Sequence, residues 1–414
     1  MSNVVGVIGS GGVTAAPWWR RVAVVVGCVA VFAASACSAG APPAERADPA
    51  AEGCISDFDP AVDYFPVKSR VEHATNFSLR YERAYQVLTV NQPYPGGAPE
   101  SYVLLKCGAP ASVVPPELAG APVIETPVRS LYAESTTQLP LLVDLGATDV
   151  LTGVGDPAFV SGAEVRGRID DGSVTGFAEN QQLATEQVIA AGPDVLLSQG
   201  VDNPAFPTLR EGGIPVIGWA EYLDGGPLGK AEWIKAMGAL TGREQQATDV
   251  FGEIESRYET MAATAADAPA VPVVLGGLFQ GSWSLAAGGS TTGTLVRDAG
   301  GTWSEADNPA PGSVERDFER VYAADGAAPV WLATTSWTSM ADVTAADPRH
   351  GEFAAVRSPN VWNSNKCLGP TGGNEFHERG VTRPDEVLAD LIAILHPELL
   401  PGHEFVYFQR LGAP

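Results

Sequence analysis

Downstream of residue 123, apolar and polar residues follow two alternating patterns along the chain. Short apolar runs, typical of buried strands, are followed by stretches whose apolar residues recur at every third or fourth position, typical of helices. The expected strands of the first half are VRSLYA (128–133), VLTGVG (150–155), SVTGF (173–177), DVLLSQG (194–200) and PVIGWA (215–220). The expected helices between them include TQLPLLVDLGA (137–147) and LATEQVIAAG (183–192). This alternation predicts a parallel sheet covered by helices.

A second set of the same kind begins at VPVVLGGLF (271–279) and ends with PDEVLADLIAILHPELL (384–400). The two halves also share a weak repeat, because TEQVIAAGPDVLLS (185–198) is matched by FERVYAADGAAPVWLA (318–333). The repeat places Glu186 and Glu319 at equivalent points. The fold class that we predict is α/β, with two Rossmann-like lobes: lobe 1, residues 123–242, and lobe 2, residues 267–414.

The stretch GGPLGKAEWIKAMGALTG (225–242) contains a Gly-Lys pair, as a phosphate-binding loop does. However, Asp224 stands where that loop needs glycine, and Ala231 stands where it needs a hydroxyl residue. We therefore predict a crossover helix that Gly242 ends. After it, apolar residues continue at helical spacing, which predicts a single long helix over 243–266 that joins the two lobes.

The N-terminus has the features of an export signal. Arg20 and Arg21 precede an apolar run, residues 22–36, that ends in small residues before Cys37. The run is shorter than a typical membrane-spanning helix. The four residues Ala-Ser-Ala-Cys (34–37) resemble a bacterial lipobox, although the position that usually holds Leu is Ala. The alternative is an ordinary signal that is cleaved nearby without lipid attachment.

We therefore expect a lipoprotein signal peptide over 1–37, lipidation of Cys37, and an exported protein anchored at the outer face of the cell membrane. Residues 38–53 have the Ala, Pro and Gly composition of a disordered tether. The stretches FSLRYERAYQVLTV (77–90) and ESYVLLKC (100–107) alternate apolar and polar residues around NQPYPGGAPE (91–100), which is typical of a hairpin. We therefore predict a β-hairpin extension over 54–122.

Beyond the leader, the chain has three cysteines, Cys54, Cys107 and Cys367. Their spacing does not form a zinc site, and an oxidising compartment favours one disulfide. Cys54 and Cys107 bracket the hairpin, so we predict that they bond and that Cys367 remains free and buried.

Composition and motifs argue against two other function classes. A net charge of −24 disfavours a nucleic-acid-binding protein, because that function needs a basic face. The sequence has neither a Gly-x-Ser-x-Gly nor a His-Glu-x-x-His motif, and its five histidines are scattered. GVGDPA (153–158) fits a dinucleotide fingerprint only loosely, because Pro157 interrupts it and no suitably placed acid follows. We therefore expect neither an enzyme nor a bound cofactor.

The order of these motifs resembles the iron-chelate and cobalamin class of ABC-transporter substrate-binding proteins, in which a rigid helix joins two lobes. The resemblance runs from about residue 123 to the end and is most specific at three stretches: PLGKAEWIKAMGALTG (227–242), VFGEIESRY (250–258) and GGNEFHERGVTRPDEVLADLIAILHPELLPGHEFVYF (372–408). One departure is His377, where relatives carry an aromatic residue such as Trp. The resemblance implies a monomer that delivers its ligand to an ABC permease dimer with its ATPase.

The resemblance also implies a ligand site in the cleft between the lobes, at the carboxyl ends of the strands. The ligand contacts that we expect from these loops are Ser135, Thr136, Asn180, Trp219, Glu221, Phe279, Trp283 and Trp337. For the tryptophans, core packing is the alternative. A ferric siderophore is the favoured ligand, and haem, with His377 as a possible iron ligand, and cobalamin remain open.

By the same resemblance, Glu186 and Glu319 are the carboxylates expected to dock on arginines of the permease, one per lobe. The alternative is that both are solvated acids at helix starts. A tethered sensor or adhesin without a permease, and less favourably an enzyme, remain as alternative functions.

Overall fold

The computed structural model describes residues 53–179 and 182–412. The predicted leader with Cys37, and the predicted tether up to residue 52, lie outside the described residues, as does Asn180.

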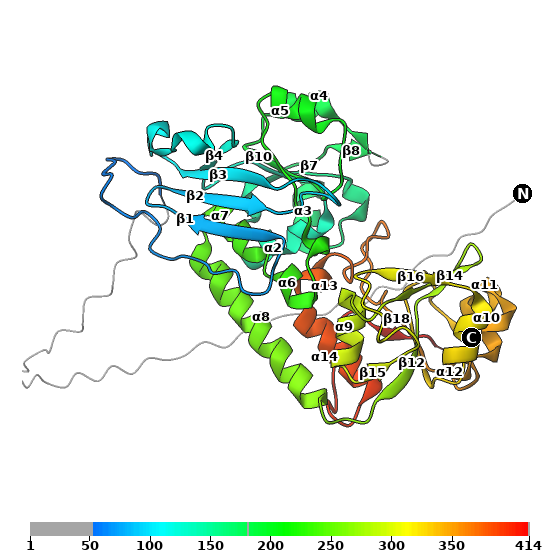
Figure 1. The fold of residues 1–414 in the computed structure, drawn as a ribbon. Coiled ribbons are helices and arrows are strands. Elements are labelled where there is room, and N and C mark those ends of the chain that lie inside the picture. Colours follow the sequence, from blue (N-terminus) through cyan, green and yellow to red (C-terminus); the bar gives the residue numbers. More distant parts are fainter. Residues whose placement is uncertain (1–52, 180–181, 413–414) are drawn as a thin grey trace, which may run out of the picture. The chain divides into compact units, whose positions relative to one another are not determined.

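A four-stranded sheet, the N-terminal sheet, precedes the first parallel sheet (Figure 1). Its strands are β1 (Phe77–Tyr81), β2 (Tyr85–Val90), β3 (Glu100–Lys106) and β4 (Val123–Thr126), in the order β1-β2-β3-β4. The first three pair antiparallel, and β4 joins β3 in parallel. The predicted hairpin is therefore only part of this sheet. The chain turns at Glu82, whose N–H donates to the Tyr85 carbonyl at 2.9 Å. This turn divides residues 77–90 into the two strands β1 and β2.

Both faces of the N-terminal sheet are covered, which explains why β2 and β3 are buried almost throughout. Leu88 and Leu104 face the hydrophobic core of lobe 1. Val87 and Val103 point to the other face, where they pack with the segment 109–121. The N-terminal sheet is thus part of the lobe 1 core and not a separate attachment.

A disulfide joins Cys54 to Cys107, the pairing that the sequence predicts. The N–H of Ile55 also donates to the Cys107 carbonyl at 2.8 Å, so the start of the described chain is held at the end of β3. Cys367 is free, but the prediction that it is buried is wrong: it lies exposed in a loop, with its thiol 3.2 Å from the Val406 carbonyl.

Two carboxylates fix the chain just before β1. Asp224 accepts hydrogen bonds from two backbone N–H groups of the segment 72–76 and from the indole N–H of Trp233. Glu232 is fully buried and accepts three N–H groups of the same segment at 2.7–2.9 Å. The ammonium of Lys235 lies 2.6 Å from the Glu232 carboxylate and forms an ion pair with it. Asp224, just before the stretch 225–242, and Glu232, within it, therefore hold the backbone of the N-terminal extension.

Lobe 1 contains a five-stranded parallel sheet in the order β11-β10-β5-β6-β7. Its strands are β5 (Leu131–Ala133), β6 (Leu151–Val154), β7 (Thr175–Gly176), β10 (Val195–Leu197) and β11 (Val216–Ile217). The helices are α2 (Leu139–Asp144), α3 (Ala163–Asp170), α4 (Thr185–Ala191) and α5 (Phe206–Glu211), and β8 (Ala178–Glu179) pairs with β9 (Gln182–Leu183). This arrangement is the α/β lobe that the alternation predicts.

Two short helices lead to the long one: α6 (Pro227–Ala231), α7 (Ile234–Thr241) and α8 (Glu244–Ala265). Gly242 ends α7 with a φ of +67°, a left-handed conformation that favours glycine. The first half of α8 packs Phe251 and Ile254 into the lobe 1 core, and its second half packs Tyr258 into the lobe 2 core. One helix thus connects both cores.

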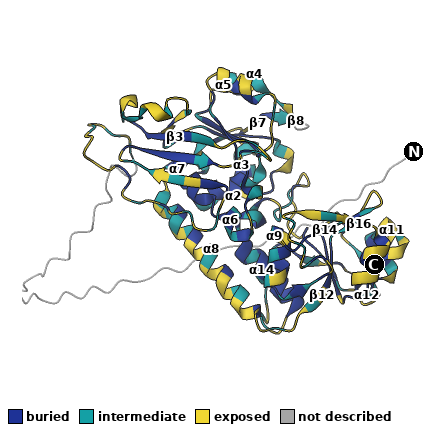
Figure 2. Ribbon diagram, in the orientation of Figure 1, coloured by how far each residue is buried: buried dark blue, intermediate teal, exposed yellow. Residues whose placement is uncertain are grey.

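Lobe 2 contains the sheet β15-β12-β17-β18-β19, in which only β19 is antiparallel. The strands are β12 (Val271–Leu275), β15 (Gly301–Thr302), β17 (Val330–Ala333), β18 (Val361–Asn363) and β19 (Gln409–Arg410). A small antiparallel sheet is formed by β13 (Gly277–Phe279), β14 (Ser282–Ala286) and β16 (Ser313–Arg316). The helices are α9 (Thr291–Asp298), α10 (Phe318–Asp325), α11 (Met340–Ala346), α12 (Ala354–Arg357), α13 (Arg379–Thr382) and α14 (Pro384–Leu395). Helix α14 is buried along most of its length and packs against α8 (Figure 2).

Candidate ligand-binding site

In the main sheet of each lobe, the strand that comes first in the chain lies inside the sheet, and the later strands are added first on one side of it and then on the other, so the strand order reverses at this strand. In lobe 1 this strand is β5, between β6 and β10, and in lobe 2 it is β12, between β15 and β17. Loops on the two sides of such a reversal diverge and leave a crevice at the carboxyl ends of the strands, where α/β sheets bind ligands. The structure has a recess at both places.

The lobe 1 recess has a volume of about 240 Å³. It is lined by residues that follow three strands: Glu134, Ser135 and Thr136 after β5, Asp156 after β6, and Gln199 after β10. The predicted contacts Ser135 and Thr136 therefore lie where the resemblance implies.

Hydrogen bonds between the loops fix the lobe 1 recess. Gln199 donates to the Glu134 carboxylate through its backbone N–H at 2.9 Å and its side-chain amide at 3.3 Å. Burial raises the pKa of Glu134, and these hydrogen bonds offset only part of the rise. Ser135 caps the next turn of helix, because its hydroxyl accepts the N–H of Thr137 at 3.3 Å. The side chains at this edge are thus held in place before any ligand arrives.

The lobe 2 recess is larger, at about 590 Å³, and mostly apolar. The hydroxyl residues Thr334, Thr335 and Ser336 follow β17, and Phe376 lines the recess as well. The predicted contact Phe279, at the end of β13, also lines it and is 71% exposed. An exposed aromatic ring beside hydroxyl groups suits a ligand with a large apolar surface.

One segment, residues 367–379, lines the lobe 2 recess and contacts the chain beside the lobe 1 recess. Phe376 lines the lobe 2 recess, and the hydroxyl of Thr371 donates to the Ala158 carbonyl of lobe 1 at 2.6 Å. A Cβ atom at Gly373 would come within 2.3 Å of the Phe159 carbonyl oxygen, so this approach requires glycine. Because Phe159 itself lines the lobe 1 recess, the segment runs from one recess to the other.

The same segment ties the lobes together. The Glu378 carboxylate is buried and accepts the N–H groups of Ser161 at 2.7 Å and Gly162 at 3.0 Å. Next to it, the Arg379 guanidinium pairs with Asp144 of α2 at 2.9 Å. These contacts fix the position of one recess relative to the other.

A comparison with known families bears on this arrangement. The model of a family described as periplasmic binding protein matches residues 131–363. The chain belongs to the periplasmic binding protein family. The match begins at β5 and ends with β18, so it includes the lobe 1 parallel sheet, α8 and every strand of the lobe 2 sheet except β19. The N-terminal sheet precedes the match. The family consists of solute-binding proteins and not of enzymes, in agreement with the sequence analysis.

A curated relative of this periplasmic binding protein is an archaeal lipoprotein. An uncharacterized lipoprotein of Methanocaldococcus jannaschii is 23% identical over 252 residues, which are 60% of this chain and 58% of the relative. This chain therefore matches little more than half the length of that lipoprotein.

Solved structures show the same fold at low identity. Helicobacter pylori Ceue with Ni(II) bound aligns with a TM-score of 0.52 and 14% identity, over 68% of this chain and 88% of that one. A possible iron-binding periplasmic solute-binding protein of Staphylococcus epidermidis aligns with a TM-score of 0.51 and 16% identity, over 66% and 100%. A periplasmic binding protein of Veillonella parvula aligns with a TM-score of 0.52 and 13% identity, over 73% of this chain and 95% of that one. These similarities confirm the predicted fold class.

Two features sought in the described residues are not found there. None of the helices in residues 53–179 and 182–412 is both long and apolar enough to cross a membrane. Within the same residues, no three His, Cys, Asp or Glu side chains are grouped so that they could hold a metal ion.

Three of the predicted ligand contacts are core residues and must be corrected. Trp219 and Trp283 are fully buried, and Trp337 is 8% exposed. The Trp219 ring packs on Trp233 at 4.8 Å between centroids, and the Trp283 indole donates to the Leu275 carbonyl at 2.8 Å. Core packing, the alternative that the sequence leaves open, therefore describes all three.

Glu221 and His377 differ from the expectation in another way. Glu221 is buried and accepts the hydroxyl of Thr137 at 2.7 Å, so it supports the loop behind the lobe 1 recess. Burial raises the pKa of Glu221. His377 is exposed, with its ring 5.2 Å from that of Phe376, which places it next to the lobe 2 recess.

The predicted docking residues occupy equivalent positions. Glu186 is in the first turn of α4 and Glu319 in the first turn of α10, and both are exposed. The strand after each helix pairs directly with the first strand of its sheet, β10 with β5 and β17 with β12. Glu319 also forms an ion pair with Arg349 at 3.1 Å.

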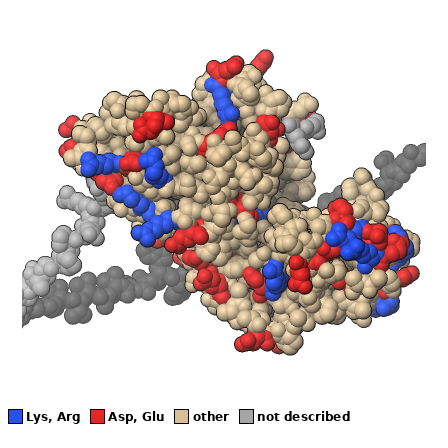
Figure 3. All heavy atoms as spheres, in the orientation of Figure 1, with Lys and Arg blue, Asp and Glu red and all other residues tan. Residues whose placement is uncertain are grey.

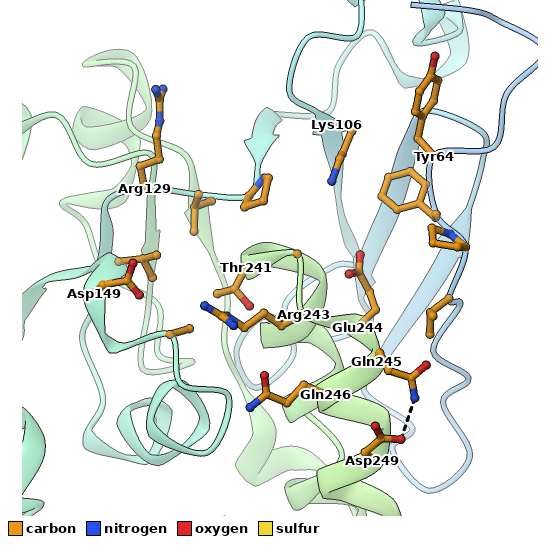
Figure 4. Close-up of a pocket in the computed structure, with 18 residues that line it drawn as sticks. Tyr64, Lys106, Arg129, Asp149, Thr241, Arg243, Glu244, Gln245, Gln246 and Asp249 are labelled. Atoms are coloured by element: carbon orange, nitrogen blue, oxygen red, sulfur yellow. Dashed lines mark hydrogen bonds between the residues drawn. The ribbon is translucent and has the colours of Figure 1, made fainter. Parts of the chain in front are cut away.

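A further hollow, about 690 Å³, lies elsewhere (Figure 4). Arg129 and Asp149, which line it, precede β5 and β6, so the hollow is at the amino ends of these strands, away from the crevice of the sheet. Lys106 of the N-terminal sheet and Arg243 and Glu244 at the start of α8 also contribute. Burial lowers the pKa of Lys106 and raises that of Glu244.

Charges of both signs are mixed on the protein surface. On the face shown in Figure 3, basic side chains lie beside acidic ones. Exposed ion pairs include those of Lys68 with Asp63 and of Arg349 with Asp347. This visible face therefore offers no continuous basic patch.

Sequence reasoning missed several residues that line the recesses. Asp156 comes directly after the predicted strand 150–155, so its position at a strand end is the signal that identifies it. Gln199 falls inside the predicted strand 194–200, but β10 ends at Leu197 and leaves Gln199 in the loop that lines the recess. Phe376 lies within a stretch that the resemblance singled out, but its approach to the lobe 2 recess depends on the long loop after β18.

Proposed function

We propose that the protein is the extracytoplasmic solute-binding component of an ABC importer. It captures a metal chelate, with a ferric siderophore as the leading candidate, at the carboxyl ends of its two parallel sheets and delivers it to a permease. The observation that supports this most directly is the pair of recesses at the two strand-order reversals, joined by one segment of chain.

The chemistry of the recesses fits a chelate better than a small polar solute. The lobe 2 recess presents the ring of Phe279, the ring of Phe376 and the hydroxyl residues 334–336 to one space of about 590 Å³. Aromatic faces give flat contact to a bulky organic shell, and hydroxyls orient it. Because the chelator supplies the donor atoms, the protein itself needs no metal ligands.

Haem is the second candidate ligand, because of one observation on His377. His377 is exposed beside Phe376, and the protein around the imidazole lowers the pKa of His377. A lowered pKa favours the neutral ring, which offers a nitrogen lone pair to iron.

A ligand panel tests the proposal. Titration of the purified protein with a ferric trihydroxamate, a ferric tricatecholate, haem and cobalamin, followed by tryptophan fluorescence and calorimetry, is expected to identify at least one ligand with a micromolar or tighter Kd. Phe279→Ala should weaken that binding by roughly tenfold, because an aromatic contact of this size contributes on the order of 1 kcal/mol or more. Val123→Ala, which truncates an exposed apolar residue on β4, is the control and should leave Kd unchanged. Failure of every compound to bind would contradict the proposal.

A lipid anchor at Cys37 completes the proposed function, and the lipoprotein relative supports it. In cells, the wild-type protein should fractionate with membranes and incorporate labelled fatty acid. Cys37→Ala should shift most of the protein to the soluble fraction, whereas Cys28→Ala, which removes the other leader cysteine, should not. A wild-type protein that takes up no fatty acid would exclude the anchor.

A further inference from the structure

We propose that the site selects a ligand that carries a positively charged group. The charged end would lie in the lobe 1 recess near Glu134 and Asp156, and the apolar body in the lobe 2 recess. This inference rests on the proposed function, since it names the class of chelate that the same site takes.

The charges that line the two recesses are all negative. Within the described residues, neither recess is lined by Lys or Arg, and the acidic side chains among the lining residues are Glu134 and Asp156. Residues 180 and 181, which follow the lobe 1 lining, are Asn and Gln and add no positive charge. An anionic ligand would therefore meet two like charges and no ion partner.

Several basic residues near the lining in sequence are held elsewhere. Arg297, which directly follows Val296 of the lobe 2 lining, donates to the Gly288 carbonyl. Arg166 donates to the Pro157 carbonyl at 2.7 Å and pairs with Asp170 at 3.5 Å. Arg379 is bound to Asp144, and the ammonium of Lys366 donates to a backbone carbonyl of the C-terminal segment. Turning any of these side chains toward the recesses would break its present contacts.

Additional acids lie just behind the lobe 1 recess on its lobe 2 side. Glu378 binds the N–H of Gly162, and the carboxylate of Glu375 lies 3.8 Å from where a Cβ atom of Gly162 would stand. Burial raises the pKa of Glu134, Glu375 and Glu378. Carboxylates in such surroundings gain from a nearby cation, because it favours their ionised form.

The two recesses also differ in size and polarity. The acidic recess is small, about 240 Å³, whereas the apolar recess is about 590 Å³ and has the 71% exposed ring of Phe279 at its edge. A ligand with a compact cationic arm and a bulky, less polar body fits this asymmetry.

Three ferric chelates that differ only in charge provide the test. A linear ferric trihydroxamate with a free amine has a charge of +1, its N-acetyl derivative is neutral, and its N-succinyl derivative has a charge of −1. Calorimetry at low salt should give a Kd for the cation that is roughly tenfold or more below that of the anion, with the neutral form between them. Raising the salt concentration should narrow the difference.

Variants assign the charge effect to the recess. Asp156→Asn keeps the capping acceptor of its turn, and Glu134→Gln keeps an acceptor for Gln199, so both should fold. The double variant should bring the three Kd values to within about twofold of one another. Glu259→Gln, which removes one charge from the exposed side of α8, should retain the wild-type order.

The outcomes separate this inference from the proposed function. Equal affinities, or tighter binding of the anion, would overturn the inference and leave chelate capture standing. Discrimination that survives in the folded double variant would also overturn it. Absence of binding by all three chelates and by the rest of the ligand panel would overturn both.

Discussion

Reversing the charge of Glu186 and Glu319 together, as Glu186→Arg with Glu319→Arg, is expected to reduce ligand uptake by cells roughly 100-fold, while ligand affinity stays within about twofold. Interfacial Arg–carboxylate pairs set orientation and register, and each reversal converts an attraction into a repulsion. Uptake of the radiolabelled ligand and its Kd for the purified variant are the two measurements.

The structure supports this prediction through the matched positions of the two acids. Each begins the helix that precedes the strand next to the first strand of its sheet, and each is exposed. The existing pair of Glu319 with Arg349 does not oppose docking, because Glu319 is 75% exposed in it and such pairs contribute little. Glu319 can exchange Arg349 for a permease arginine at small cost.

A matched double variant controls for net charge. Glu211→Arg with Glu352→Arg reverses one exposed acid in each lobe, outside the first turns of α4 and α10, and should leave uptake near the wild-type level. If the Glu186 and Glu319 double variant folds, binds ligand and still supports normal uptake, both residues are ordinary solvated acids at helix starts.

Removing the Cys54–Cys107 disulfide, as Cys54→Ser with Cys107→Ser, is expected to lower the free energy of unfolding by about 4 kcal/mol. The bond closes a loop with a sequence separation of 53 residues, and without it the unfolded chain gains the entropy of that open loop. The loop contains β1, β2 and β3, which supply Leu88 and Leu104 to the lobe 1 core. Denaturant unfolding of the variant and the wild type gives the difference directly.

The third cysteine is the control for this prediction. Cys367→Ser removes a free, exposed thiol and should change the free energy of unfolding by less than about 0.5 kcal/mol. Equal stability of the disulfide variant and the wild type would show that the segment before β1 is held by Asp224 and Glu232 alone.

The parts of the fold that could be predicted from the sequence are those with long, regular patterns. Helix α8 lies within the range that its apolar spacing indicates, because every turn places a residue such as Phe251 or Ile254 against a core. The strands were harder to delimit. The stretch 77–90 has the alternation of one long strand, and only the backbone turn at Glu82 divides it.

The candidate site was predictable only in outline. The resemblance implies a site at the carboxyl ends of the strands, and Ser135, Thr136 and Phe279 line the recesses there. Whether a loop aromatic points outward depends on its neighbours, which periodicity does not reveal. Trp283 thus turns into the core, where the Leu275 carbonyl accepts its indole N–H, and Phe279, four residues earlier, remains exposed.

The exposed thiol of Cys367 provides a built-in position for an optical reporter. Cys54 and Cys107 are bonded to each other, so a maleimide dye added to a protein that starts after the leader would react at this one site. Cys367 opens the segment that lies against Ala158 and Phe159 at the lobe 1 recess and continues to Phe376 at the lobe 2 recess. A polarity-sensitive fluorophore there would report ligand arrival through its emission, and would turn this protein into a reagentless sensor for the molecule that it captures.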